Sequence, residues 1–265
     1  NMQDITLRAL DILRSVDVVA SEDTRKTGRL LKHFEIQAQQ IPFHEHNEEQ
    51  AGARIVGLLN AGQSVAVVTN AGTPGISDPG AILVNNARRS GIPIIPIPGP
   101  SALTAALSCA GLEPGAFLFS GFAPAKASAR KKLLESLSTS SYPLVFYESP
   151  HRIGHFIKDA HAVLGDREVL WAREISKKYE EIEGTTLALL DSKIGSDKIR
   201  GELVVIVHPG SEDKPEAESL EEILVWYRDN SALSLKDVCK RVAADMGIGR
   251  SEIYKQALTI WNKKQ

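Results

Sequence analysis

The sequence predicts an α/β protein of two domains followed by a small helical bundle. Short apolar segments that end in turn residues alternate with longer amphipathic stretches, the pattern of an α/β chain with largely parallel sheets. A length of 265 residues is enough for two cores. Glycine-rich and polar stretches interrupt this pattern twice. We therefore expect α/β domains over residues 1–112 and 113–209, a linker over 210–219 and a helix-turn-helix-like bundle over 220–265.

The strands are predicted from apolar runs bounded by turn residues, with helices of roughly 10–15 residues between them. The clearest helix is Asn47–Ala61, which ends before Gly62 and has Ile55, Leu58 and Leu59 on one face. The predicted strands are Val16–Ala20, Ile41–Phe43, Ser64–Thr69, Ile92–Ile97, Ala116–Phe119, Leu144–Tyr147, Val169–Ala172 and Leu203–Val207.

The first predicted helix has no strand before it. Asp4 is placed as its N-cap, with apolar positions at Ile5, Leu10 and Ile12. We expect that a strand and its loop are absent ahead of this helix.

Both predicted boundaries have turn-forming or polar composition. Gly111–Gly115 separates the two α/β regions, and Pro209–Ser219 is acidic and contains Pro215. After it, Leu220–Tyr227, Leu235–Met246 and Ser251–Trp261 are predicted helices.

Composition excludes several classes of protein. The formal net charge of −2 is too low for a protein that coats nucleic acid, although local basic patches remain possible. Cys109 and Cys239 are the only cysteines, which excludes a disulfide framework and a cysteine-rich zinc site. No apolar run is long enough to span a bilayer. A soluble protein of the reducing cytoplasm is expected.

The richest turn is residues 69–80, Thr-Asn-Ala-Gly-Thr-Pro-Gly-Ile-Ser-Asp-Pro-Gly, directly after an apolar strand. Its small residues let backbone groups approach a ligand at the carboxyl end of a sheet. The structural alternative is a tight turn in which Asp78 caps a helix opened by Pro79. A second turn, residues 96–102, precedes another helix, and there Ser101 is either an N-cap or part of the same cleft.

These two turns, Thr73–Gly80 and Pro98–Ala102, resemble hallmarks of the tetrapyrrole-methylase-like methyltransferases. Further stretches are similar, in order and position, to the branch that methylates the ribose 2′-hydroxyl of a cytidine in 16S ribosomal RNA. They are Ser21–Thr27, Phe43–Glu48, Tyr147–Arg152, Ala172–Glu174 and Gly201–Val204.

The resemblance implies a two-domain, class III fold, usually a homodimer, that binds S-adenosylmethionine between its domains. Position 70 is asparagine where that family usually has aspartate, so only backbone contacts are expected there. The resemblance places the donor against Asn70, Ala71, Gly72, Thr73, Ser101, Ala102, Phe146, Tyr147, Arg173, Gly201 and Glu202.

Three side chains are candidates for removing a proton from a ribose hydroxyl: Asp23, Glu148 and His44. Asp23 follows a strand but is equally well placed as an N-cap. His44 and His46 have the alternate spacing of some metal ligands, yet no third ligand is evident, so no metal is expected.

Candidate RNA contacts are regional. Arg152 is suited either to a phosphate or to an ion pair with Glu148. The basic run Lys126, Arg130, Lys131 and Lys132 is either a solvated helix face or a backbone contact. The remaining candidates are Arg25, Asn47, and, in the bundle, Lys240 and Arg241, where a packing or dimerisation role is the alternative.

Three functions therefore stay open on the sequence. The first is ribose methylation of small-subunit ribosomal RNA, free or in the 30S subunit. The second is methylation of a small tetrapyrrole-like acceptor, which would not need a basic bundle. The third is a non-catalytic RNA-binding relative, because Asn70 replaces the aspartate that the family usually has.

Overall fold

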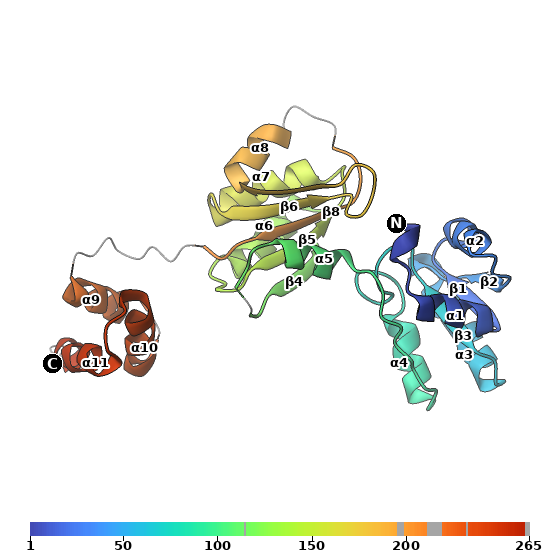
Figure 1. Ribbon diagram of the computed structural model, residues 1–265, viewed down its shortest axis with the longest axis horizontal. Helices are drawn as coiled ribbons and strands as arrows, with labels where there is room; N and C mark the ends of the chain where they lie inside the picture. The colour runs from blue at the N-terminus through green and yellow to red at the C-terminus, as the bar shows by residue number, and fades with distance from the viewer. Residues whose placement is uncertain (114, 195–198, 211–218, 232, 263–265) are drawn as a thin grey trace. The chain divides into compact units, whose positions relative to one another are not determined.

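The computed structural model describes residues 1–262 except 114, 195–198, 211–218 and 232, and it forms two compact units, 1–210 and 211–265 (Figure 1). The first unit contains two sheets, which fall on either side of residue 112. Most of the predicted linker, 210–219, lies outside the described residues.

The first sheet has three parallel strands in the order β2-β1-β3. Valine-rich β1 and β3 pair in register, Val18 with Val65, and β-branched residues suit this ladder, in which β1 is fully buried. The strands are β1 Val18–Ser21, β2 Gln39–Pro42 and β3 Val65–Val68, and the accompanying helices are α1 Leu7–Ser15, α2 Thr24–His33, α3 Glu48–Asn60 and α4 Ala81–Arg89, with short 3₁₀ helices η1 Met2–Asp4 and η2 Glu45–Asn47.

Two predictions for this region are wrong. The segment Ile92–Ile97 forms no strand and is largely exposed, because Pro93 and Pro96 lack the N–H groups that a ladder needs. Asp4 does not cap the first helix. Thr6 does, since its Oγ1 accepts from the Ala9 N–H at 3.1 Å.

The second sheet has five strands in the order β4-β5-β8-β6-β7. Only β4 and β5 are parallel, so the expectation of largely parallel sheets is wrong here. Strand β7 was not predicted because its sequence, Glu-Ile-Glu-Gly-Thr-Thr, is polar, which an edge strand tolerates. The strands are β4 Leu118–Phe122, β5 Leu144–Glu148, β6 Glu168–Arg173, β7 Glu181–Thr186 and β8 Leu203–Val207.

Helices cover both faces of this sheet, so β8 is buried along its whole length and the middle residues of β5 and β6 are buried as well. On one face Phe146, Trp171 and Val205 pack beneath α6 Ala127–Leu137, α7 Ile153–Leu164 and α8 Leu187–Ile194. On the other, Val145 and Ile206 pack against Ala106 of α5 Ala102–Cys109. Continuous apolar runs such as β8 are the sequence signature of a strand buried on both faces. This rigid sheet supports the loops at its strand ends.

The C-terminal unit is a bundle of α9 Leu220–Asn230, α10 Leu235–Met246 and α11 Arg250–Asn262, as predicted. Ser219 and Glu222 form a capping box at the start of α9. Gly247, with φ of 65°, ends α10 in the left-handed conformation that glycine adopts without strain. The core of the bundle consists of Leu224, Tyr227, Val238, Cys239, Val242, Ile253, Ala257 and Ile260.

Candidate active site

The loop from β3 to α4 presents its backbone to solvent. Residues 70–73 are exposed, and φ is positive at Gly72, Gly75 and Gly80 (73°, 79° and 140°) and at the non-glycine Ser77 (63°). Positive φ angles are adopted mainly by glycine, and a residue without a Cβ lets a ligand approach the backbone closely. The helix that follows begins at Ala81 with Gly80 as its N-cap, so the structural alternative, in which Asp78 caps a helix opened by Pro79, is wrong.

Two carboxylates hold the two ends of this loop. Glu22 Oε2, just after β1, accepts from Thr69 Oγ1 at 2.6 Å and from the Asn70 N–H at 2.8 Å. Glu48 Oε1, in the first turn of α3, accepts from the Gly80 N–H at 2.9 Å. Neither side chain is among the site residues predicted from the sequence. The signal for Glu22 was its place at the carboxyl end of a strand adjacent to β3.

The second bend meets Tyr147 at the end of β5. The Leu103 N–H donates to the Tyr147 hydroxyl at 3.1 Å, and the Ser101 hydroxyl also bonds to it. Ser101 therefore occupies the N-cap position of α5 without capping it through its side chain. Burial raises the pKa of Tyr147, and the charge of Asp78 raises it further.

Asp78 links the two bends electrostatically. Its half-buried carboxyl has a raised pKa, first because of burial and then because of the negative charges of Glu22 and Glu202. Ser77, beside it, meets β4: a Cβ added at Gly121 would lie 2.9 Å from Ser77 Oγ. The loop at 69–80, Tyr147 and the start of β8 are thus neighbours.

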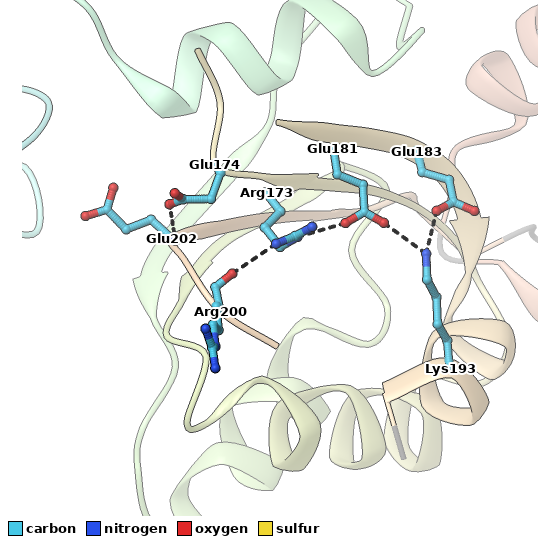
Figure 2. A network of polar contacts seen from close by, with 7 residues as sticks. All are labelled: Arg173, Glu174, Glu181, Glu183, Lys193, Arg200 and Glu202. Atoms are coloured by element: carbon cyan, nitrogen blue, oxygen red, sulfur yellow. Dashed lines mark hydrogen bonds and ion pairs between the residues drawn. The ribbon is translucent and has the colours of Figure 1, made fainter. Parts of the chain in front are cut away.

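The start of β8 is fixed by the ionic network that Figure 2 shows. Arg173 Nε bonds Glu181 Oε2 at 2.8 Å, and Arg173 Nη1 donates to the Arg200 carbonyl at 3.3 Å. Glu174 Oε1 accepts from the Glu202 N–H at 2.9 Å. The predicted donor contacts Arg173 and Glu202 are therefore engaged within the chain: the Arg173 side chain holds the bend at Arg200, and the Glu174 side chain holds it at the Glu202 N–H.

A glycine is required at the centre of this bend. Gly201 has φ of 94°, and a Cβ there would lie 2.3 Å from Glu174 Cγ. Lys177 Nζ bridges Glu174 and Glu202 at 2.7 and 2.9 Å. The side chains of residues 174 and 202 are thereby held beside the bend.

The predicted proton acceptors are differently placed. The Asp23 carboxylate caps α2, accepting from the N–H groups of Arg25 and Lys26 at 2.9 and 3.3 Å, which lowers its pKa. The Glu148 side chain is fully buried, burial raises its pKa, and it pairs with Arg152 Nε at 3.3 Å. Arg152 also donates to the Ala123 carbonyl. Glu148 and Arg152 thus form the structural ion pair that was one of the two alternatives.

The histidine segment has a local structural function. The Asn47 side chain accepts from the His44 N–H at 2.8 Å and donates to the Pro42 carbonyl at 3.1 Å, so it closes the turn into α3. His44 is half-buried and its ring lies 6.0 Å from that of His46. Among the described residues no group of three potential ligands could hold a metal ion.

The remaining candidates are divided between core and surface. Phe146 is fully buried and packs on Phe156, so its side chain does not line a cleft. The basic run at 126–132 is not a uniform solvated face, because Arg130 is buried against Asp159 at 2.6 Å. Lys126, Lys131 and Lys132 of that run are exposed, as are Arg25 on α2 and Lys240 and Arg241 on α10.

The fold and these two bends define a family: the chain belongs to the tetrapyrrole (corrin/porphyrin) methylases, whose family model matches residues 1–191. Two curated relatives are each named ribosomal RNA small subunit methyltransferase I. The relative from Vibrio cholerae is 43% identical over 97% of this chain and 91% of its own length. The relative from Escherichia coli O157:H7 is 41% identical over the same shares.

Among solved structures, the uroporphyrin-III C-methyltransferase of Thermus thermophilus, crystallised with S-adenosylhomocysteine, has the same fold. The TM-score is 0.55, with 19% identity over 78% of this chain and 91% of that one. The predicted fold class is thereby confirmed. No helix within the described residues is both long and apolar enough to cross a bilayer.

Proposed function

We propose that the protein transfers a methyl group from S-adenosylmethionine to the ribose 2′-hydroxyl of a cytidine in small-subunit ribosomal RNA. One observation carries the assignment: relatives that share about two-fifths of the sequence over nearly the whole chain, bundle included, are named for that RNA. The distant tetrapyrrole methylases share the fold alone, at 17–21% identity. This disfavours a small tetrapyrrole-like acceptor.

The donor fits the residues at the two bends. Residues 70–73 are exposed, Gly72 leaves the backbone without a Cβ, and the Tyr147 and Ser101 hydroxyls lie at the second bend. The 69–73 turn, Ser101, Ala102 and Tyr147 would hold the donor, and Gly201 would border it. When bound, S-adenosylmethionine supplies an electrophilic methyl group on a sulfonium. The protein's own contribution is alignment of that group with the acceptor oxygen.

A ribose hydroxyl is a weak nucleophile, so a group that accepts its proton assists the transfer. Asp23 is a poor choice because its pKa is lowered, and Glu148 is too deeply buried to reach a substrate. Asp78 is half-buried beside the loop and has a raised pKa. We assign the proton-accepting role to Asp78 in place of Asp23 and Glu148.

The RNA would be bound by regional positive charge, because the chain as a whole is not basic. Arg25 on α2, Lys126 before α6, and Lys240 and Arg241 on α10 are exposed cations suited to phosphates. We further propose that the chain acts as a homodimer in the cytoplasm. Exposed apolar side chains near α4, Ile76 and Ile82 at 47% and 45% exposure, support pairing with a second copy.

The test is methylation of isolated small ribosomal subunits with a labelled donor. The proposal predicts label on one ribose 2′-oxygen and no label when that nucleotide carries a 2′-deoxyribose. Label that survives the 2′-deoxy substitution would refute ribose methylation. Label on a tetrapyrrole but not on RNA would favour the alternative.

A further inference from the structure

Glu22 and Asp17 occupy matching positions at opposite ends of one strand pair. At the amino end of β1 and β3, Asp17 Oδ2 accepts from the Ser64 N–H and from Ser64 Oγ, both at 2.8 Å. At the carboxyl end, Glu22 Oε2 accepts from the Thr69 hydroxyl and the Asn70 N–H. Each carboxylate thus ties the two strands together through one hydroxyl and one backbone N–H.

The two carboxylates differ in the segment of chain that they hold. Ser64 belongs to an exposed turn that follows α3. Thr69 and Asn70 begin the loop whose exposed residues 70–73 are the proposed donor turn. The Glu22 carboxylate fixes the Asn70 N–H directly, and charge-assisted bonds of this kind are stronger and more directional than neutral ones. The path of the chain from Ala71 to Thr73 therefore starts from a position that Glu22 sets.

We propose that Glu22 is a positioning residue that sets the affinity for the methyl donor by holding the 69–73 turn in its binding conformation. This inference rests on the proposed function, since it takes that turn as the donor site. Glu22 acts through Thr69 and Asn70 and does not itself touch the donor. An asparagine at position 70 is compatible with this arrangement, because the contact with Glu22 is made by the backbone.

The experiment compares Glu22→Ala with Asp17→Ala in the full chain, by calorimetry with S-adenosylhomocysteine. Both variants lose one carboxylate tie between β1 and β3. Glu22→Ala is expected to bind about tenfold more weakly, because the turn loses both hydrogen bonds to the carboxylate and has to be ordered when the compound binds. Asp17→Ala is expected to bind as the wild type does. Circular dichroism melting of both variants measures the loss of stability that they share.

Two further variants grade the effect. Thr69→Val removes the hydroxyl and keeps the Asn70 bond, and Glu22→Gln keeps an acceptor oxygen without the charge. Both should bind with affinities between those of the wild type and Glu22→Ala. If Glu22→Ala does not fold, these two variants carry the test against Asp17→Ala.

Equal affinity in the Glu22 and Asp17 variants would overturn the proposal, as would a failure of the wild type to bind the compound. A wild type that binds it but methylates no RNA would refute the proposed function and leave the role of Glu22 standing. In turnover assays, a positioning role predicts that KM for the donor rises more than kcat falls.

Discussion

The Tyr147 hydroxyl accepts a hydrogen bond from the Leu103 N–H at 3.1 Å, which joins the end of β5 to the first turn of α5. The two residues are 44 positions apart in the chain. This bond fixes the second bend against the sheet, on the side where Asp78 also influences the tyrosine. The proposed donor site depends on that junction.

Tyr147→Phe should weaken binding of S-adenosylhomocysteine by about three- to tenfold, because a net hydrogen bond contributes about 0.5–1.5 kcal/mol. The ring would keep its edge-on contact with Phe119, 4.9 Å away between centroids. Calorimetry measures the affinity, with Tyr142→Phe, an exposed tyrosine outside the site, as the control. Unchanged affinity would show that the hydroxyl does not organise the bend.

Asp78→Asn should lower kcat by about two to four orders of magnitude while donor binding persists, if this carboxylate accepts the proton. In the wild type, the rate should fall as the pH decreases through the raised pKa of Asp78, because the protonated form cannot accept another proton. The decline should therefore begin above the usual range for an aspartate. A pH profile of kcat that is the same in both proteins would contradict the assignment.

Gly201→Ala should destabilise the first unit by about 1–3 kcal/mol, because a side chain at φ of 94° is strained and would overlap Glu174. Gly184→Ala in β7, where a Cβ meets nothing within 4 Å, is the matched control. Urea unfolding measures both. Adding Glu174→Ala to Gly201→Ala should restore part of the lost stability, because it removes the overlap with the new Cβ. If no stability is restored, the destabilisation comes from the strained backbone alone.

Arg152→Ala should cost about 3–5 kcal/mol of folding stability, because it leaves the buried Glu148 carboxylate without its cation. The exposed pair of Arg14 and Asp11 offers the control, since Arg14→Ala should cost about 1 kcal/mol or less. The measurement is urea unfolding at neutral pH. A cost below that of the exposed pair would contradict the structural role.

Glu148 also predicts a pH dependence with a definite sign. Its folded-state pKa is raised by burial, so the native state holds the proton more tightly than the unfolded state. Its contribution to stability therefore decreases as the pH rises from the unfolded-state pKa through the raised folded-state pKa. Glu148→Gln should remove this decrease, which urea unfolding across that pH window would measure.

Replacing Lys240 and Arg241 by glutamate should weaken RNA binding. The slope of log K against the logarithm of the salt concentration should become shallower by about 0.7 for each phosphate contact that is lost, which is the value for single strands. Affinity for S-adenosylhomocysteine should not change. Replacing Arg88 and Arg89, two exposed cations of α4, by glutamate makes the same change in net charge and is the control. Filter binding over a range of salt concentrations gives the slope, and an unaltered slope would assign the bundle to packing or dimerisation instead.

Local patterns predicted the elements with clear periodicity. The bundle and helix α3 were found because apolar spacing and terminal glycines mark them, as at Gly62 and Gly247. Both bends were found because small residues followed apolar strands. Periodicity could not distinguish Ile92–Ile97 from a strand, since it is equally apolar, and could not detect β7, whose pairing with β6 compensates for a polar sequence.

The site was less predictable because its interactions are long-range. Nothing local indicates that Glu22 bonds to Asn70, 48 positions away, or that Asp78 lies near Glu202. Glu148 was predicted to be catalytic because it lies at the end of a strand. Its side chain instead points into the core and is fully buried. Charged residues could be assigned to core, cap or surface only after tertiary packing was known.

Hydrogen–deuterium exchange with and without S-adenosylhomocysteine tests most directly whether the two bends form one donor site. The account predicts slower exchange of the amides at 70–73 and at 102–103 on binding, with no change at the 61–64 turn at the opposite end of the sheet. Protection of only one bend, or protection confined to other segments, would contradict it.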